Sequence, residues 1–299
     1  MTHYLFAAAM LVLASVWPSP QTDPAADIRQ AETLMEAGDL AGAVATLEKT
    51  VAAAPTSFDA RLILGRALDL QGRHDAARVH LEEAVKLASD RQRNTALSSL
   101  GVSYAFQSKA DEAARYYQRA YDAQVQADDT GGAAGLANAL ARVYLESGNL
   151  QKAEQWYTTG FEMAKKIPGL PASEAALWEM RFHHAQARIA ARRGNNAAAE
   201  KHAEAVRVAL DKGVPENQRS AYPYLLGYIA FYTKDYRQAV EALLKGDQSD
   251  PFVLGLIAQS YQKLGDRDKA AEFYKKVMAS PAHSINAAFA RPLARAFLR

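Results

Sequence analysis

A helix-breaking turn that recurs along the chain constrains the fold more than any other feature of this sequence. Its clearest copy lies in residues 58–90, where Gly72 separates two short segments with apolar residues at helical spacing. Leu64 and Leu68 share one face before the turn, and Leu81 belongs to a similar stripe after it. Two helices this short cannot bury their apolar faces alone, so they need similar pairs as neighbours. The pattern therefore predicts an array of helix pairs.

The same turn can be placed seven times, at intervals of 31 to 46 residues. The turn positions are Gly38, Gly72, Ser108, Gly148, Gly194, Lys234 and Gly265. Glycine readily takes the left-handed backbone conformation that ends a helix. An Asp or Asn follows directly in five copies, where its side chain can cap the next helix: Asp39, Asn149, Asn195, Asp235 and Asp266.

Columns of small residues keep a fixed distance from these turns. Five residues after each turn stands an alanine: Ala43, Ala77, Ala113, Ala153, Ala199, Ala239 and Ala270. Seven residues before each turn stands another small residue: Ala31, Gly65, Gly101, Ala141, Ala187, Gly227 and Ala258. Small side chains at fixed positions let two helices approach closely, so these columns predict where the helices of each pair cross.

With these columns aligned, the chain resembles tetratricopeptide repeat proteins. The residues that carry the resemblance are Leu64-Gly65, Leu68, Gly72, Ala77, Leu81 and Ala84, with Leu100-Gly101, Tyr104, Ala113, Tyr117 and Ala120 in the next unit. The resemblance covers residues 24–278. It implies an all-α fold, an α-solenoid of about seven antiparallel helix pairs wound into a right-handed superhelix.

The expected repeats cover about 24–57, 58–91, 94–127, 134–168, 174–213, 220–251 and 252–281. After them, residues 282–299 are helical in pattern and predict a C-terminal capping helix over the open end of the last repeat. Pro292 within that segment is expected to kink the helix or divide it in two.

The first residues indicate export from the cytoplasm. Tyr4 to Trp17 is an apolar run, too short for the roughly 20 residues that cross a bilayer. We expect a signal peptide in residues 1–20, with a buried N-terminal helix as the alternative. The chain has no cysteine, which excludes a lipid-modified cysteine after the signal. The sequence thus predicts a periplasmic or secreted protein without stable membrane insertion once the signal is removed.

Composition and motifs argue against several function classes. Lys plus Arg number 35 against 33 for Asp plus Glu, a formal net charge of +2 that does not favour nucleic-acid binding. The histidines lack the spacing of metal ligands, and no phosphate-binding glycine loop or nucleophile motif is present. We therefore expect no enzyme activity, no cofactor and no metal.

Positively charged residues gather on one predicted helix face in the fifth repeat. These residues are Arg181, His184, Arg188 and Arg192, and the last three stand four apart in one stripe. Because first helices line the concave groove in the family that the chain resembles, we expect Arg142 of the fourth repeat to point to the same region. Such cations would favour an acidic partner. The alternative is an ordinary solvated face.

An aromatic face follows in the sixth repeat, formed by Tyr224, Tyr228, Phe231 and Tyr232. Aromatic side chains bury a large area and keep a polar tip, which suits the recognition of peptides. Alternatively, these rings pack beneath the seventh repeat or the C-terminal cap.

We interpret the chain as a non-enzymatic scaffold or adaptor in the bacterial envelope. It would bind a peptide or protein in its concave groove through the basic face of repeat five and the aromatic face of repeat six. An alternative is a carbohydrate or small-ligand binding module that uses the aromatic face. The oligomeric state is left open by the sequence.

Overall fold

The computed structural model describes residues 23–299, and within them the fold consists of α-helices, one short 3-10 turn and no strand. The predicted signal peptide lies outside the described residues. The first eight helices are α1 (Pro24–Glu36), α2 (Leu40–Ala53), α3 (Phe58–Gln71), α4 (His74–Leu87), α5 (Asp90–Phe106), α6 (Ala110–Gln126), α7 (Thr130–Glu146) and α8 (Leu150–Ala164). The others are α9 (Ala172–Arg192), α10 (Asn196–Asp211), α11 (Ala221–Tyr232), α12 (Tyr236–Leu243), α13 (Pro251–Leu264), α14 (Arg267–Ala279) and α15 (Ile285–Leu298), with the 3-10 turn at Glu216–Gln218.

Helices α1 to α14 form seven pairs, and α15 follows them, which confirms the predicted all-α solenoid. Two first helices, α5 and α7, begin four residues before the expected repeats. Helix α5 starts at Asp90 because the Gln92 side chain accepts the Ser89 N–H at 3.1 Å. Helix α7 starts at Thr130 because the Asp129 side chain accepts the Gly132 N–H at 2.8 Å.

All seven predicted turn residues take positive φ, and two of them are not glycine. Ser108 lies at 58° and Lys234 at 67°, so the left-handed turn forms there without the residue that tolerates it best. The five predicted Asp and Asn caps each accept a backbone N–H three residues further on. The same side-chain cap therefore follows the turn in five of the seven pairs, whereas α4 and α6 begin without one.

The small-residue columns lie where the helices of a pair cross. All seven alanines of the first column are 0% exposed. A Cβ added to Gly65 would lie 2.6 Å from Leu81 Cγ, and one added to Gly101 would lie 2.6 Å from Tyr117 Cε2. Glycine is thus required at these two crossings by the neighbouring side chain.

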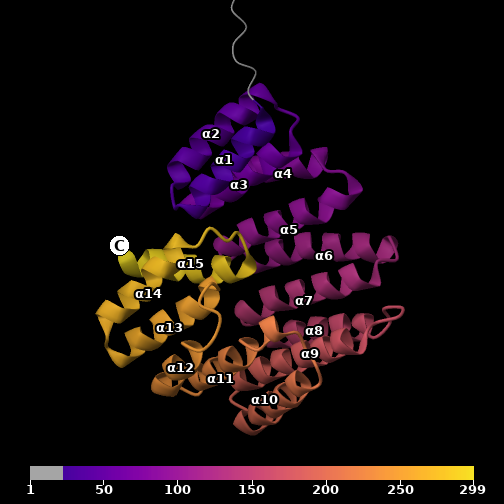
Figure 1. Ribbon diagram of the computed structural model, residues 1–299, viewed down its shortest axis with the longest axis vertical. Coiled ribbons are helices and arrows are strands. Elements are labelled where there is room, and N and C mark those ends of the chain that lie inside the picture. Colours follow the sequence, from indigo (N-terminus) through magenta and orange to yellow (C-terminus); the bar gives the residue numbers. More distant parts are fainter. Residues whose placement is uncertain (1–22) are drawn as a thin grey trace, which may run out of the picture.

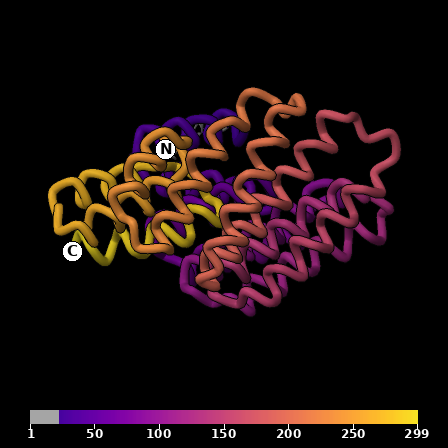
Figure 2. Tube along the Cα trace, turned by 90° about the horizontal axis from the view of Figure 1, so that it is seen from below, coloured from indigo at the N-terminus to yellow at the C-terminus, as the bar shows by residue number. Residues whose placement is uncertain are grey.

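The array doubles back on itself (Figures 1 and 2). In Figure 1, helices α1 to α10 descend on one side, and α11 to α15 return on the other. This path brings α15 beside α5 and α7 as well as α13 and α14.

Helix α15 continues through Pro292, so of the two effects expected of this proline, a kink or a division of the helix, the division does not occur. It also does more than cover the last repeat, since it bridges the C-terminal pair to the N-terminal half. Across residues 23–299, no helix combines the length and apolar character needed to cross a membrane.

Candidate functional site

The concave side of the array contains two adjoining pockets. One, of ≈680 Å³, lies between α5, α7 and the start of α15. The other, of ≈450 Å³, lies between α7, α9 and α11. They share Ala139, Arg142 and Asn286, and we call them together the central groove.

The central groove is lined by positive charge. Arg66 and Arg142 line the first pocket, while Arg142, Arg181 and Arg188 line the second. No Asp or Glu of residues 23–299 lines either pocket. The groove therefore presents guanidinium groups without carboxylates on the same walls.

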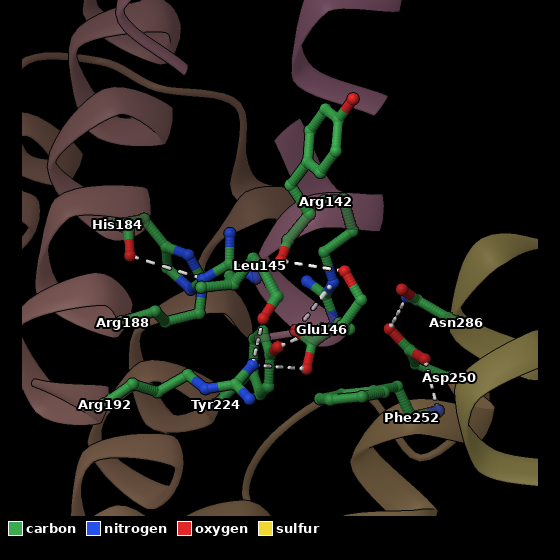
Figure 3. Close-up of polar contacts among 12 residues, drawn as sticks. Arg142, Leu145, Glu146, His184, Arg188, Arg192, Tyr224, Asp250, Phe252 and Asn286 are labelled. Carbon is green, nitrogen blue, oxygen red and sulfur yellow. Dashed lines mark hydrogen bonds and ion pairs between the residues drawn. The ribbon is translucent and has the colours of Figure 1, made fainter. Parts of the chain in front are cut away.

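Behind the wall, the Glu146 carboxylate at the end of α7 pairs with Arg142 of the groove and with Arg192, which lies outside both pockets (Figure 3). Arg142 Nε lies 3.0 Å from Glu146 Oε1, an ion pair without hydrogen-bond alignment. Arg192 Nη1 lies 3.5 Å from Glu146 Oε2 and also donates to the Leu145 carbonyl. One side chain that is 4% exposed thus balances two guanidinium groups.

Arg142 joins three repeats. Its Nη2 donates to the Tyr224 hydroxyl at 3.2 Å, and its guanidinium carbon lies 4.5 Å from the centroid of the Phe252 ring. Burial acts to lower the pKa of Arg142, but Tyr224 and Glu146 raise it well above its ordinary value. Arg142 therefore stays charged although it lies deep in the groove wall.

Arg188 and His184 form the floor of the second pocket. Arg188 is 5% exposed and donates through Nη2 to the Tyr157 hydroxyl at 3.1 Å. Burial, together with Arg188 and Arg142, holds the pKa of His184 well below its ordinary value, so its imidazole is neutral. Among the described residues, Arg188 Nη1 and His184 Nε2 have no hydrogen-bond partner. Each of these two buried nitrogens can therefore form one more hydrogen bond at the floor of the pocket.

The aromatic face of repeat six is largely consumed by packing. Tyr228 is 0% exposed, and its ring lies 4.7 Å from Tyr232 and 6.5 Å from Phe252. Phe231 packs edge-on against Tyr232 and Tyr236. Most of these rings are therefore packed inside the protein, as in the alternative that places them beneath repeat seven.

A third pocket, of ≈410 Å³, lies on the other side of this aromatic cluster. It is bounded by the turn between α5 and α6 and by α11, α13 and α15, and its lining includes Tyr232, Phe252, Leu256, Phe289 and Leu293. Of the described residues that line it, none is an arginine, unlike those that line the central groove.

Five of the nine predicted partner-binding residues line the central groove: Arg142, Arg181, His184, Arg188 and Tyr224. Tyr232 lines the third pocket instead. Arg192, Tyr228 and Phe231 line none of these three pockets. Arg192 pairs with Glu146, and the Tyr228 ring lies 5.8 Å from the guanidinium carbon of Arg188.

Several residues of the site were missed by sequence reasoning. Arg66, on α3 in repeat two, was not among the predicted partner-binding residues. Asn286 belongs to the C-terminal helix, and its Nδ2 donates a hydrogen bond to Asp250 Oδ2 at 2.6 Å. Burial raises the pKa of Asp250, which makes it a weaker counter-charge for Arg142. Only the curvature of the array places Asn286 and Asp250 beside Arg142, so no local signal could have identified them.

The described residues offer hydrogen-bond donors in the groove rather than a set of metal ligands. In residues 23–299, no three His, Asp or Glu side chains are placed to hold a metal ion. His183 and His202 lie within 3.0 Å of each other between α9 and α10, outside both pockets of the groove.

Comparison with known sequence families agrees with this architecture. Profiles described as "Tetratricopeptide repeat" match residues 28–92, 92–166, 180–205, 224–252 and 253–280. The match at 180–205 lies within the fifth repeat, where Gln186 and Ala190 replace the usual leucine and aromatic. A search of curated proteins found no match.

Solved structures with the same architecture are distant in sequence. A tetratricopeptide repeat protein from Parabacteroides merdae ATCC 43184 is 14% identical, with a TM-score of 0.52 over 92% of this chain and 97% of that one. PilW, described as a widely conserved type IV pilus biogenesis factor, is 15% identical, with a TM-score of 0.49 over 74% of this chain and 91% of its own. At such identities the likeness extends to the fold alone. From the profiles and the seven helix pairs together, the chain belongs to the tetratricopeptide repeat family.

Proposed function

We propose that this protein is a non-enzymatic adaptor that binds an acidic segment of a protein partner in the central groove. Tetratricopeptide repeats generally mediate protein–protein interactions, which gives the class of function. The observation that carries the proposal is the pair of adjoining pockets lined by four arginines and, within residues 23–299, by no carboxylate.

The chemistry of the groove favours carboxylates on the partner. A guanidinium group binds a carboxylate through two parallel hydrogen bonds, and these bonds are stronger where water is excluded. Arg181 is exposed at the mouth, whereas Arg188 lies at the floor with Nη1 free of any partner in the described chain. An acidic segment could therefore contact Arg181 at the mouth of the groove and Arg188 at its floor.

The shape of the first pocket suits an extended backbone. The walls from α5 and α7 carry small side chains, including Ser98, Ser99, Gly132, Gly135 and Ala139. Because these side chains are small, the main chain of a bound peptide can lie close to the two helices. Asn94 and Thr95 on α5, with Asn286 on α15, offer polar atoms along the same path.

The carbohydrate-binding alternative is not favoured by this arrangement. It needs a free aromatic platform on repeat six, but Tyr228 is fully buried and Phe231 packs against its neighbours. Of the four predicted rings, only Tyr224 lines the central groove.

We place the adaptor in the bacterial envelope, as a periplasmic or secreted protein. The support is the apolar run from Tyr4 to Trp17 followed by polar sequence. N-terminal sequencing of protein purified from the envelope fraction should find a first residue between Ser15 and Asp23. Recovery of the chain in the cytoplasm with Met1 intact would contradict this location.

Affinity capture with matched charge reversals tests the binding site. Arg181→Glu reverses an exposed cation at the mouth of the groove, and Arg115→Glu reverses an exposed cation on α6, outside both groove pockets. We expect a protein captured by the native chain from its own cells to be lost with Arg181→Glu and retained with Arg115→Glu. Equal capture by both variants would refute the groove as the binding surface.

A further inference from the structure

A buried Asp–His pair joins the C-terminal segment to the second repeat. His283 Nε2 donates to Asp69 Oδ2 at 2.8 Å, across 214 residues of sequence. The Asp69 side chain is 0% exposed and the His283 side chain 3% exposed. His74 Nδ1 and Ser103 Oγ each lie 2.9 Å from Asp69 Oδ1, so this carboxylate is held by three side chains.

A second set of bonds ties the same two regions together. Arg291 Nη2 and Arg295 Nη2 donate to the Leu70 carbonyl at 3.0 and 3.2 Å. The rest of the contact is apolar, because Ala287 on α15 is fully buried in the core that α15 shares with the N-terminal repeats. The contact of α15 with α3 and α5 is therefore specific, not a loose covering of the last repeat.

The segment also forms part of the groove wall. His283, Ser284, Ile285 and Asn286 line the first pocket, and Asn286 lines the second. If the segment moved away from α3 and α5, the groove would lose one side.

Protonation of His283 works against this contact. Within residues 23–299, its Nδ1 has no hydrogen-bond partner, so a second ring proton would be buried without an acceptor. Burial lowers the pKa of His283, and nearby Arg66 acts in the same direction, while Asp69 opposes them without reversing the shift. The other polar and aromatic groups at the contact are His74 and Ser103 on Asp69, Phe106 against the ring, and Arg291 and Arg295 on the Leu70 carbonyl.

We propose that residues 280–299 form a pH-sensitive strap, which the Asp69–His283 pair holds against α3 and α5 as one wall of the central groove at neutral pH and releases on mild acidification. The proposal goes beyond the adaptor function, because opening of the strap is a property of the free chain and needs no partner.

The sign and size of the effect follow from linkage. In the open strap His283 would regain an ordinary pKa of 6.5, whereas in the closed strap it stays neutral to lower pH. Lowering the pH from 7.5 to 5.5 should therefore favour opening by up to about tenfold. The pKa of Asp69 is lowered by its hydrogen bonds from His283, His74 and Ser103, although burial alone would raise it. Asp69 thus remains ionised throughout this pH range.

Thiol labelling of the full-length chain measures the opening directly, because the native sequence contains no cysteine. Ala287→Cys places one thiol on the buried face of the strap itself, and Ala199→Cys places one at an equally buried position in repeat five. Both positions are 0% exposed, so each thiol reacts with a soluble disulfide reagent only after its region opens. The ratio of the two labelling rates removes the pH dependence of the reagent.

We expect this ratio to rise by up to about tenfold between pH 7.5 and 5.5. In a His283→Gln background, the amide still donates to Asp69 but does not titrate, so the ratio should stay constant. A ratio that is independent of pH in the native background, or that rises equally with His283→Gln, would overturn the proposal. Ala199→Cys in the same background shows whether the variant is folded.

Discussion

Arg291 donates to the backbone carbonyl of Leu70 at 3.0 Å and so links α15 to α3 across 221 residues of sequence. Its Nη1 donates to the carbonyls of Met278 and Ser280, each at 2.9 Å. One buried guanidinium group therefore joins the last helix pair to the second, and the solenoid becomes a closed arrangement rather than an open arc.

Loss of this guanidinium should destabilise the fold. Arg291→Met keeps much of the side-chain volume but removes the donor to the carbonyls of Met278 and Ser280, and leaves the Leu70 carbonyl with Arg295 alone. We expect the free energy of unfolding to fall by about 1–3 kcal/mol in urea denaturation. Arg237→Met, at an exposed position on α12, should change it by less than about 0.5 kcal/mol. Equal values for the two variants would mean that the link contributes nothing.

Two glycine substitutions should act in opposite directions. Gly65→Ala puts a Cβ 2.6 Å from Leu81 Cγ and should destabilise the fold by about 1–3 kcal/mol. Gly135→Ala, on α7, meets no atom within 4 Å and should stabilise it by about 0.5–1 kcal/mol. Thermal denaturation of both variants checks the helix crossings, and destabilisation by Gly135→Ala would contradict this description.

The buried carboxylate behind the groove should matter far more than an exposed one. Glu146→Gln leaves Arg142 and Arg192 without their shared counter-charge, and we expect a loss of about 3–5 kcal/mol. Glu154→Gln breaks the half-exposed pair with Arg193 and should cost less than about 1 kcal/mol. Chemical denaturation at neutral pH provides both values. If Glu146→Gln resembled Glu154→Gln, the arginines would not depend on Glu146.

Asp250 provides a pH-dependent prediction with a definite sign. Burial raises its pKa above the ordinary 3.8, so the folded state binds this proton more tightly than the unfolded state does. The ionised side chain therefore weakens the fold progressively as pH rises from 3.8 through the folded pKa.

Asp250→Asn keeps an acceptor for the Phe252 N–H, now bonded at 2.8 Å, and removes the charge. The variant should be more stable than the native chain at pH 7, and this advantage should vanish below pH 3.8. A lower free energy of unfolding for the variant at pH 7 would show that the charge of Asp250 is stabilising.

The repeat architecture could be predicted because it depends on local geometry. The turn at Ser108 and the turn at Lys234 were placed without a glycine, from the alanine five residues later in each case. Both residues have positive φ, and both alanines, Ala113 and Ala239, are 0% exposed. A fixed spacing between turn and crossing is a property of a single helix pair, so it is visible in sequence.

The closure of the array and the depth of the groove could not be predicted in this way. They depend on small rotations that accumulate from one repeat to the next. His283 meets Asp69 only after 214 residues of this accumulated curvature. Tyr228, by contrast, is buried by the next repeat, where Phe252 of α13 lies 6.5 Å from its ring. The sequence identified the residues of the aromatic face and left open whether they were buried or free.

Photo-cross-linking in living cells tests the central claim, that the concave groove receives the partner, most directly. A benzophenone amino acid at Thr95 or Arg181 places the probe at an exposed position lining the groove, and the same probe at Val79 on α4 is 63% exposed outside it. We predict one protein, acidic in the segment that is cross-linked, at both Thr95 and Arg181 and none at Val79. Cross-linking that is equal at all three positions, or strongest at Val79, would contradict the assignment of the groove.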